Sequence, residues 1–324
     1  MSHAVRIHEF GGPEVLRWDE VSVGEPGPGE VRLRQAAIGL NYIDTYHRTG
    51  LYKLPALPAV IGVEGAGEVE AVGPGVTSVK PGDRVAYAGP IGGYAETRLI
   101  AADRLVLLPD WLDYIQAAGM MLQGMTAEFL LRRVYCVQPG DAVLVQAAAG
   151  GVGLLLCQWA SKLGATVIGT VSTEEKAELA RRNGAHHVIL YSRENFVERV
   201  RELTKGAGVA VVYDGVGQST FLGSLDCLRP RGMMVSFGQA SGLIPPFDPA
   251  LLGAKGSLFL TRPSLFTYTA SRADLELSAA TLFEAVKSGT LTIEVNQTFA
   301  LAEAAAAHRA LEGRATTGAT VLLP

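Results

Sequence analysis

The sequence predicts an α/β fold with a doubly wound parallel sheet, and three observations lead to this prediction. An apolar run, Ala142–Gln146, ends in the glycine-rich turn Ala147–Gly153, and the apolar helical pattern Leu154–Lys162 follows at once. Further along, strand-like runs alternate with helical patterns. The strands are almost wholly apolar, which is typical of strands buried on both faces of a sheet. Alternation of this kind predicts parallel strands joined by crossover helices.

Each later element of this region has its own signal. Ala165–Val171 is rich in β-branched residues and predicts a strand, and Gly184 and Gly206 are suited to end the helices expected at Glu174–Asn183 and Glu194–Lys205. The other strands are expected at His187–Tyr191, Val209–Tyr213, Gly232–Gly238 and Ser257–Thr261, with a helix near Thr220–Leu228. Residues 142–161 carry no charge and match a membrane span in length. The adjacent glycines and the βαβ continuation favour a buried strand and helix instead.

The first 120 or so residues differ in composition and in the length of their apolar segments. Prolines and glycines are frequent, as in Glu25–Gly29, and the segments between them are short and β-like, which predicts a compact antiparallel barrel. Its strands are expected at Val31–Ala37, Gly67–Val72, Arg84–Ala88 and Ala95–Ile100. Helices are expected at Asn41–Thr49, within Pro109–Leu131, at Arg272–Ser288 and at Leu301–Leu311. A closing strand at Gly318–Leu323 is expected to return to this first domain.

Composition narrows the classes of function. A chain of 324 residues is expected to form two domains or one large one. A net charge of −4 gives no electrostatic reason to expect nucleic-acid binding. The first ten residues lack the apolar core of a signal peptide, and the three cysteines are scattered as free thiols would be. We therefore expect a cytoplasmic protein that does not associate with membranes.

The glycine-rich turn predicts a dinucleotide site. In the G-x-G-x-x-G pattern the three key positions are Ala148, Gly150 and Gly153, so alanine replaces the first glycine. Such a turn lets a pyrophosphate approach the backbone, and the following helix presents free N–H groups to it. We expect Gly150, Gly151, Val152 and Gly153 to bind the cofactor. The alternative is an ordinary strand–turn–helix with small residues at the turn.

Four segments together resemble the medium-chain dehydrogenase/reductase superfamily over the whole chain: Gly62–Gly73, Pro81–Val85, Gly92–Glu96 and Ala147–Gly153. The chain is most similar to the zinc-free quinone oxidoreductase (zeta-crystallin-like) branch, through Gly39–Asp44, Gly124–Thr126, Ala147–Gly153 and Arg262–Leu265. This resemblance implies a GroES-like catalytic domain at residues 1–121, a Rossmann domain at 122–262, a return to the catalytic domain at 263–324, and an active site in the cleft.

The resemblance also bears on metals. Zinc-dependent relatives bind a catalytic zinc through cysteine and histidine, because thiolate and imidazole bind this ion tightly. Here Asn41 takes the cysteine position and Val63 the histidine position. The structural zinc of those relatives needs four clustered cysteines, and the sequence has three scattered ones. We expect no metal.

The second strand of the Rossmann domain indicates which dinucleotide binds. An NAD site usually offers an acidic residue at the end of this strand, whereas Gly169–Thr173 ends without one. Lys176 and Arg314 could instead hold a 2′-phosphate, which favours NADPH. Both match the phosphate-contacting set implied by the resemblance, as does Tyr191, and we add Ser172 to the expected cofactor contacts. Each charge could alternatively lie on the surface without this role.

Three residues are candidates for catalysis. Asn41 can hydrogen-bond near the nicotinamide or the acceptor carbonyl, and Tyr46 can donate to a developing oxyanion. Asp44 is expected to orient its partners. Alternatively, Asp44 could be a first-turn helix carboxylate, and Tyr46 a packed aromatic. The residues expected on the nicotinamide side are Thr126, Phe237 and Gly238.

The expected function is NADPH-dependent reduction of quinones or related electrophilic acceptors by direct hydride transfer. One alternative is reduction of an enone or alkenal double bond, and another is a structural or RNA-binding role like that of some zeta-crystallin relatives. The apolar edge strand near Ser257–Leu260 predicts a homodimer, because an exposed apolar edge aggregates unless it is covered. Relatives in this branch are typically dimers of this kind.

Overall fold

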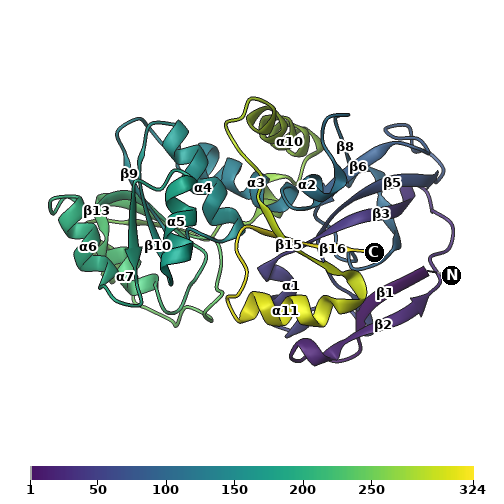
Figure 1. Ribbon diagram of the computed structural model, residues 1–324, viewed down its shortest axis with the longest axis horizontal. Coiled ribbons are helices and arrows are strands. Elements are labelled where there is room, and N and C mark those ends of the chain that lie inside the picture. The colour runs from purple at the N-terminus through teal and green to yellow at the C-terminus, as the bar shows by residue number, and fades with distance from the viewer. Residues whose placement is uncertain (1) are drawn as a thin grey trace. The chain divides into compact units, whose positions relative to one another are not determined.

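The computed structural model describes residues 2–324, which form two compact units (Figure 1). Unit 1 comprises the chain up to Gln123 together with Thr269–Ala279 and Ile293–Pro324, and unit 2 comprises Gly124–Tyr268 and Ala280–Thr292. The chain therefore leaves and re-enters unit 1, and residues 263–268 and 280–292 group with unit 2.

Unit 2 is built on a six-stranded sheet in the order β11-β10-β9-β12-β13-β14, and every neighbouring pair is parallel. The register aligns Val145 of β9 with Gly169 of β10 and with Tyr213 of β12. The carboxyl ends of these strands therefore meet at one edge of the sheet. The strands are β9 (Ala142–Val145), β10 (Thr166–Val171), β11 (His187–Leu190), β12 (Val209–Asp214), β13 (Leu228–Ser236) and β14 (Phe259–Thr261).

Helices cover both faces of this sheet, as the sequence predicts. Figure 1 shows α4 and α5 on one side and α6 and α7 on the other. Between the layers lies an apolar core that includes Leu144, Ile168 and Val212. The bounds are α4 (Gly151–Lys162), α5 (Glu174–Arg182), α6 (Phe196–Leu203), α7 (Phe221–Asp226) and α8 (Ala250–Ala254).

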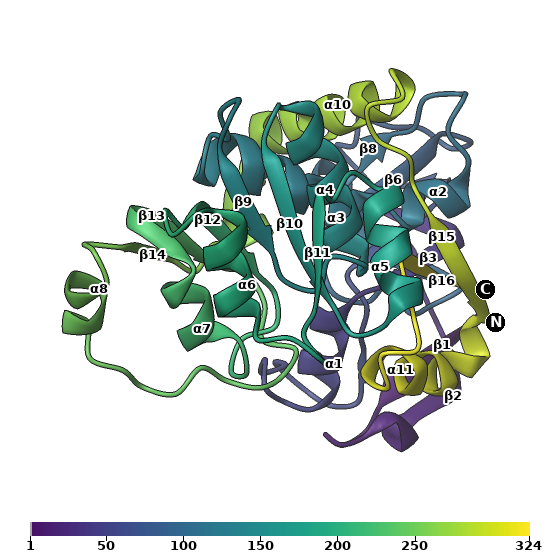
Figure 2. The same cartoon turned by 60° about the vertical axis from the view of Figure 1, so that its left-hand side comes forward.

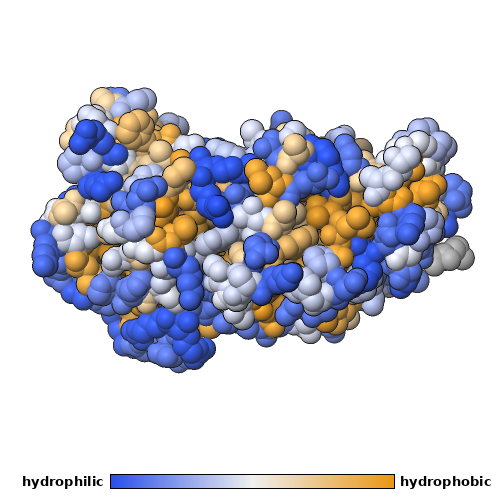
Figure 3. All heavy atoms as spheres, turned by 90° about the horizontal axis from the view of Figure 1, so that it is seen from above, coloured by the Kyte–Doolittle hydropathy of each residue, from blue (hydrophilic) through white to orange (hydrophobic). Residues whose placement is uncertain are grey.

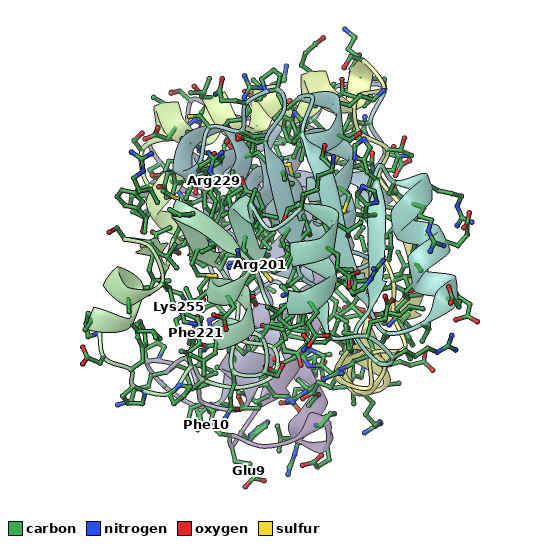
Figure 4. All side chains as sticks on the ribbon, turned by 90° about the vertical axis from the view of Figure 1, so that its left-hand side faces the viewer. Glu9, Phe10, Arg201, Phe221, Arg229 and Lys255 are labelled. Carbon is green, nitrogen blue, oxygen red and sulfur yellow. The ribbon has the colours of Figure 1, made fainter. Side chains whose placement is uncertain are left out.

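Local signals explain where these helices begin and end. Thr173 caps α5 by accepting a hydrogen bond from the Lys176 N–H, and Gly184, with φ of +92°, follows the C-cap of that helix. At the end of α7, Arg201 donates to the Asp226 carbonyl and Lys255 pairs with the Asp226 carboxylate (Figure 4). Positive side chains at the C-terminus of a helix are stabilised by the negative end of the helix dipole.

Unit 1 holds a seven-stranded sheet and a three-stranded one. The long strand β3 (Glu30–Leu40) pairs antiparallel with β5, β7 and β16, and the three-stranded sheet has the order β2-β1-β4. The C-terminal strand β16 returns to this unit as expected, with Val321 opposite Gly39. The other strands are β1 (Ser2–Ile7), β2 (Leu16–Val21), β4 (Ala59–Val60), β5 (Glu64–Val72), β6 (Arg84–Ala88), β7 (Thr97–Ala101), β8 (Val106–Leu107), β15 (Val295–Ala300) and β16 (Ala319–Leu323).

Two helices of unit 1 position the candidate catalytic residues. Helix α1 (Tyr42–Arg48) follows β3 directly, and α11 (Ala304–Glu312) lies beside it in both Figures 1 and 2. Helix α2 (Tyr114–Ala118) also belongs to unit 1 and α9 (Leu265–Tyr268) to unit 2, whereas α3 (Met121–Phe129) and α10 (Arg272–Lys287) each contribute residues to both units.

The structure also differs from several sequence-based expectations. Strand β14 begins at Phe259 rather than Ser257, because Gly256 and Ser257 have positive φ and form a turn. The helical connection expected within 109–131 is divided into α2 and α3, followed by a π-helical turn at Leu130–Val134. Strands β1, β2, β4, β8 and β15 were not expected.

The uncharged segment 142–161 is divided between β9 and α4. Among residues 2–324, no helix has both the length and the apolar character needed to cross a membrane. On the face shown in Figure 3, apolar residues form separate patches interrupted by hydrophilic ones.

Candidate active site

The glycine-rich turn of unit 2 has the geometry that a pyrophosphate site needs. Ala147 has φ of +55°, and Gly150 caps α4, whose first N–H groups lack partners within the helix. A Cβ on Gly153 would lie 2.3 Å from the Ala147 carbonyl oxygen, so helix and turn approach too closely for a larger residue. A helix N-terminus whose first N–H groups are available, and whose preceding turn packs closely against it, is suited to bind a diphosphate group.

Of the residues expected around the 2′-phosphate, Ser172, Lys176 and Tyr191 lie at the same edge of the sheet, where β10 and β11 end. The Tyr191 N–H donates to the Val171 carbonyl at 3.1 Å, and the backbone carbonyl of Ser172 accepts from the Ser192 hydroxyl at 2.9 Å. Lys176 lies in the first turn of α5, and Tyr191 is 41% exposed. A lysine and polar residues at this strand end fit a phosphate better than a ribose hydroxyl.

The loop that follows β13 is hydrogen-bonded to the last residue of β12. The N–H groups of Phe237 and Gly238 both donate to the Asp214 carbonyl, at 2.9 and 3.4 Å. A Cβ on Gly238 would lie 2.4 Å from the Gly215 carbonyl oxygen, so glycine is needed for this close approach. Phe237 and Gly238 thus occupy the edge at which α/β sheets bind ligands.

The buried carboxylate of Asp214 holds this edge in place. Its Oδ1 accepts from the N–H groups of Val216 and Gly217, and its Oδ2 accepts from the hydroxyls of Thr220 and Ser224. A second set of bonds continues from Ser224 through Gln146 to Thr170, which ties the ends of β9, β10 and β12 together. Asp214 and Gln146 are site residues that the sequence did not reveal.

In unit 1, Asn41 lies at the end of β3 and is held by two buried side chains. Its Nδ2 donates to Glu64 Oε2 at 2.6 Å, and its Oδ1 accepts from Gln123 Nε2 at 3.3 Å. Glu64 Oε1 accepts from the Leu122 N–H at 2.7 Å. Burial raises the pKa of Glu64 to about 8, despite these hydrogen bonds. The amide of Asn41 is therefore fixed in orientation by groups that surround it.

Asp44 lies in the first turn of α1, is fully buried and contacts Asn41. Its Oδ2 accepts from the Asn41 N–H at 2.9 Å and from the Tyr94 hydroxyl at 2.9 Å. Burial raises the pKa of Asp44 to about 7, and the two hydrogen bonds oppose that rise. Its Oδ1 has no hydrogen-bond partner among the described residues. These contacts suit an orienting role, and Asp44 is also the first-turn carboxylate of the alternative interpretation.

Tyr46 belongs to an aromatic cluster on α1 and the segment that follows it. Its ring lies 5.7 Å from that of Tyr42 and 5.2 Å from that of Tyr52, and Tyr46 is 8% exposed. His47 meets Tyr52 edge-on at 5.9 Å, and burial lowers the pKa of His47. The cluster offers flat apolar surface together with phenolic hydroxyls.

Two further expected site residues lie in other elements. Thr126 lies in α3 and is buried in unit 2, and Arg314 follows α11 in unit 1 with φ of +58°. The structure thus groups the expected residues in two sets. In unit 2 all of them except Thr126 lie at one edge of the parallel sheet, and in unit 1 Asn41, Asp44 and Tyr46 lie at or within α1.

Glu64, Gln123 and Tyr94 also belong to the unit 1 site but were not singled out from the sequence. Each is far from Asn41 and Asp44 along the chain, and although Glu64 and Tyr94 lie within the family segments Gly62–Gly73 and Gly92–Glu96, nothing local links them to α1. A charged residue at the start of the buried strand β5 is the one signal that could have pointed to Glu64.

The side chains at the zinc positions of related enzymes are Asn41 and Val63, neither of which is suited to bind zinc. Among residues 2–324, no group of three or more histidine, cysteine or acidic side chains is placed to hold a metal ion.

Comparisons with known proteins identify the family. Residues 27–110 match the alcohol dehydrogenase GroES-like domain, and residues 151–276 match the zinc-binding dehydrogenase family. A quinone oxidoreductase of Pseudomonas aeruginosa is 54% identical, with 100% of both chains covered. A 2-haloacrylate reductase of Burkholderia sp. is 52% identical over 100% of this chain and 99% of its own.

A solved structure agrees with these relatives. The quinone oxidoreductase of Escherichia coli complexed with NADPH is 46% identical, has a TM-score of 0.98, and covers 99% of this chain and 100% of its own. With this fold, the glycine-rich turn and the absence of zinc ligands at the two family positions, the chain belongs to the zinc-free quinone oxidoreductase branch of the medium-chain dehydrogenase/reductase superfamily.

Proposed function

We propose that the protein catalyses NADPH-dependent reduction of quinones by direct hydride transfer, without a metal. The observation that carries this proposal is the full-length similarity to quinone oxidoreductases, combined with Asn41 and Val63 at the zinc positions. A quinone is already a good hydride acceptor, so the protein need not supply a Lewis acid. Its task is to orient the two reactants and exclude water.

Bound NADPH would supply the hydride, and the chain's own residues would supply binding and orientation. The N-terminus of α4, from Gly150 to Gly153, would hold the pyrophosphate, with Phe237, Gly238 and Thr126 on the nicotinamide side. Asn41 has two amide protons and gives one to Glu64. The other is available for the nicotinamide or the acceptor carbonyl.

Tyr46 is proposed to donate a hydrogen bond to the oxygen of the acceptor on which negative charge develops. Its place among Tyr42 and Tyr52 supports this role, because a flat acceptor can pack on aromatic rings while a hydroxyl meets its carbonyl. Asp44 fixes the Asn41 backbone and is proposed to act through it.

Steady-state turnover of NADPH with a series of p-quinones tests the proposal, and a 2-alkenal and a 2-haloacrylate serve as competing acceptors. The 2-haloacrylate reductase relative is the observation that favours double-bond reduction as the second candidate. If a quinone gives a kcat/KM at least tenfold above that of both competitors, quinone reduction is supported. The reverse order would assign the protein to double-bond reduction.

The preference for NADPH is expected to depend on Lys176. Changing Lys176 to methionine should weaken NADPH binding about 10- to 150-fold, which corresponds to about 1.5–3 kcal/mol for a charge-assisted hydrogen bond. NADH binding should change less than twofold, because NADH lacks the phosphate. Fluorescence titration with both cofactors measures this difference. Arg314→Met tests the second proposed cation independently, and equal losses for NADPH and NADH would show a structural role.

We also propose a homodimer formed through β14. This strand ends the six-stranded sheet, and its Phe259 and Leu260 are 57% and 36% exposed. A two-fold axis beside the strand would pair it with its copy and cover this apolar edge.

Changing Phe259 to proline should shift the protein toward monomer, because proline removes a backbone donor from the edge. Sedimentation velocity at micromolar concentration measures the shift. Phe259→Thr removes the apolar ring but keeps the N–H, so comparing the two variants separates the loss of the backbone donor from the loss of apolar surface. A wild-type protein that sediments as a monomer would refute the dimer.

We propose the cytoplasm as the location of the protein. Cys136, Cys157 and Cys227 are all free thiols, as in proteins kept in a reducing compartment.

A further inference from the structure

A buried chain of polar side chains begins and ends on helix α1. Arg48, the last residue of this helix, donates from Nη1 to His308 Nδ1 of α11 at 2.9 Å. His308 Nε2 lies 3.0 Å from the hydroxyl of Tyr94, and that hydroxyl donates to Asp44 Oδ2 at 2.9 Å. Asp44 lies one helical turn before Arg48, and all four side chains are at most 1% exposed.

The chemistry of arginine fixes the direction of every hydrogen bond in this chain. A guanidinium has donors and no acceptor, so His308 Nδ1 must accept. Burial and the charge of Arg48 lower the pKa of His308 to about 3, so the ring is neutral and its proton is on Nε2. His308 therefore donates to the Tyr94 oxygen, and the single proton of Tyr94 is left for Asp44.

Arg48, the first side chain of this hydrogen-bonded series, is held by further contacts. Arg48 forms two bonds of 2.8 Å to the carboxylate of Glu312, and its Nε donates to the Gly11 carbonyl at 3.1 Å. A buried guanidinium held on three sides has one orientation, and it transmits that orientation to His308.

The last side chain of the series, Asp44, sets the position of Asn41. Asp44 Oδ2 accepts from the Asn41 N–H as well as from Tyr94, so the carboxylate holds the junction between β3 and α1. Rotation of Asp44 would release this junction and, with it, the amide that the proposed function places near the reacting groups.

We propose that Tyr94 and His308 are positioning residues for the hydride-transfer site, which act by holding Asp44 as a hydrogen-bond acceptor that fixes Asn41. This inference rests on the proposed function for the role of Asn41 but not for the hydrogen-bond directions. No proton needs to move along the chain during turnover, because neutral His308 has no source of a second proton other than a guanidinium.

Several titratable groups face Asp44. Tyr94 contacts it directly from the segment after β6, and Glu64 of β5 and Tyr87 of β6 interact with its charge. His308 of α11 and Arg48 of α1 act on its partner Tyr94. The Tyr94 hydroxyl stabilises the carboxylate form, since its hydrogen bond lowers the Asp44 pKa. If the carboxylate is the active form, the acid limb of the kcat/KM profile for the quinone reports on this bond.

The first experiment measures that profile. Tyr94→Phe should move the midpoint of the acid limb upward by at least half a pH unit and lower kcat more than it raises the KM for NADPH. His308→Gln should stay within threefold of wild type, because an amide can both accept and donate. His308→Leu should behave like Tyr94→Phe. If Tyr94→Phe and His308→Leu lower only thermal stability and leave the midpoint in place, the two residues are merely structural and the proposal is wrong.

The second experiment needs no turnover and so separates this inference from the proposed function. The ¹⁵N chemical shifts of histidine-labelled protein report the tautomer of each ring, and the His308 signal is the one lost in His308→Gln. A neutral Nε2–H ring from pH 6 to 8 is expected. A proton on Nδ1, or a ring that becomes charged in this range, would overturn the assigned directions even if quinone reduction holds. An inactive wild type with the expected tautomer would refute the proposed function, and the positioning of Asn41 for hydride transfer with it, while the assigned hydrogen-bond directions would stand.

Discussion

Replacing Gly153 with alanine is expected to lower the affinity for NADPH at least tenfold, or about 1.4 kcal/mol. The added Cβ would lie 2.3 Å from the Ala147 carbonyl oxygen and 2.9 Å from Ala148 Cα. Both neighbours are backbone, so the turn itself must move away from α4. The N–H groups that are proposed to meet the pyrophosphate would then lose their alignment. Isothermal titration calorimetry with NADPH measures this loss of affinity.

The matched control is Gly253→Ala in α8 of the same unit. No atom lies within 4 Å of the Cβ that this change adds, and alanine favours a helix. It should leave NADPH affinity unchanged and should not lower the melting temperature. Unaltered affinity in Gly153→Ala would mean that the glycine-rich turn does not bind the cofactor.

The sequence predicted the fold of unit 2 well because its signals are local. Most strands of the sheet contain a short apolar run, and residues such as Gly184 mark the helix ends. The polar start of β13 escaped prediction, because Arg229, Pro230 and Arg231 precede its apolar run. The failures have local causes as well. Ser257 is β-like in its sequence context but has φ of +57°, so β14 starts later. The N-terminal strands β1 and β2 carry charged residues on both sides of their apolar ones, which obscures the alternation.

Of the candidate site, too, only the parts with a local sequence signal could be predicted. The glycine-rich turn and Asn41 stand in motifs whose spacing is visible in the chain. The hydrogen bonds that hold the site are not visible in this way, because Glu64 is 23 residues from Asn41 and His308 is 260 residues from Arg48. A buried hydrogen bond between distant residues depends on the packing of β3, β5 and α11, and no local pattern encodes it.

Glu64 is expected to contribute a fall in the free energy of unfolding as the pH rises from about 4.5 to 8, whereas His308, whose pKa is lowered from 6.5 to about 3, contributes a rise up to about pH 6.5. Burial raises the pKa of Glu64 from 4.5 to about 8. In this range the unfolded chain has lost the proton and the folded protein retains it. Stability falls with pH wherever the folded state binds more protons, and the dependence should end above the folded pKa. Asp44, with its pKa raised to about 7, adds to the slope in the same direction.

Glu64→Gln tests this directly, because an amide keeps the shape of the side chain and cannot ionise. The variant loses one acceptor, since Glu64 receives hydrogen bonds from both Asn41 and Leu122, so it should be less stable than wild type at pH 5. The difference should narrow as the pH rises to 8, because wild type alone carries the cost of ionising a buried carboxyl at residue 64. Urea unfolding at pH 5, 6.5 and 8 measures the trend. The exposed Glu276→Gln is the matched control and should follow wild type throughout. A stability difference between Glu64→Gln and wild type that stays constant from pH 5 to 8 would show that Glu64 ionises in the folded protein as readily as in the unfolded chain.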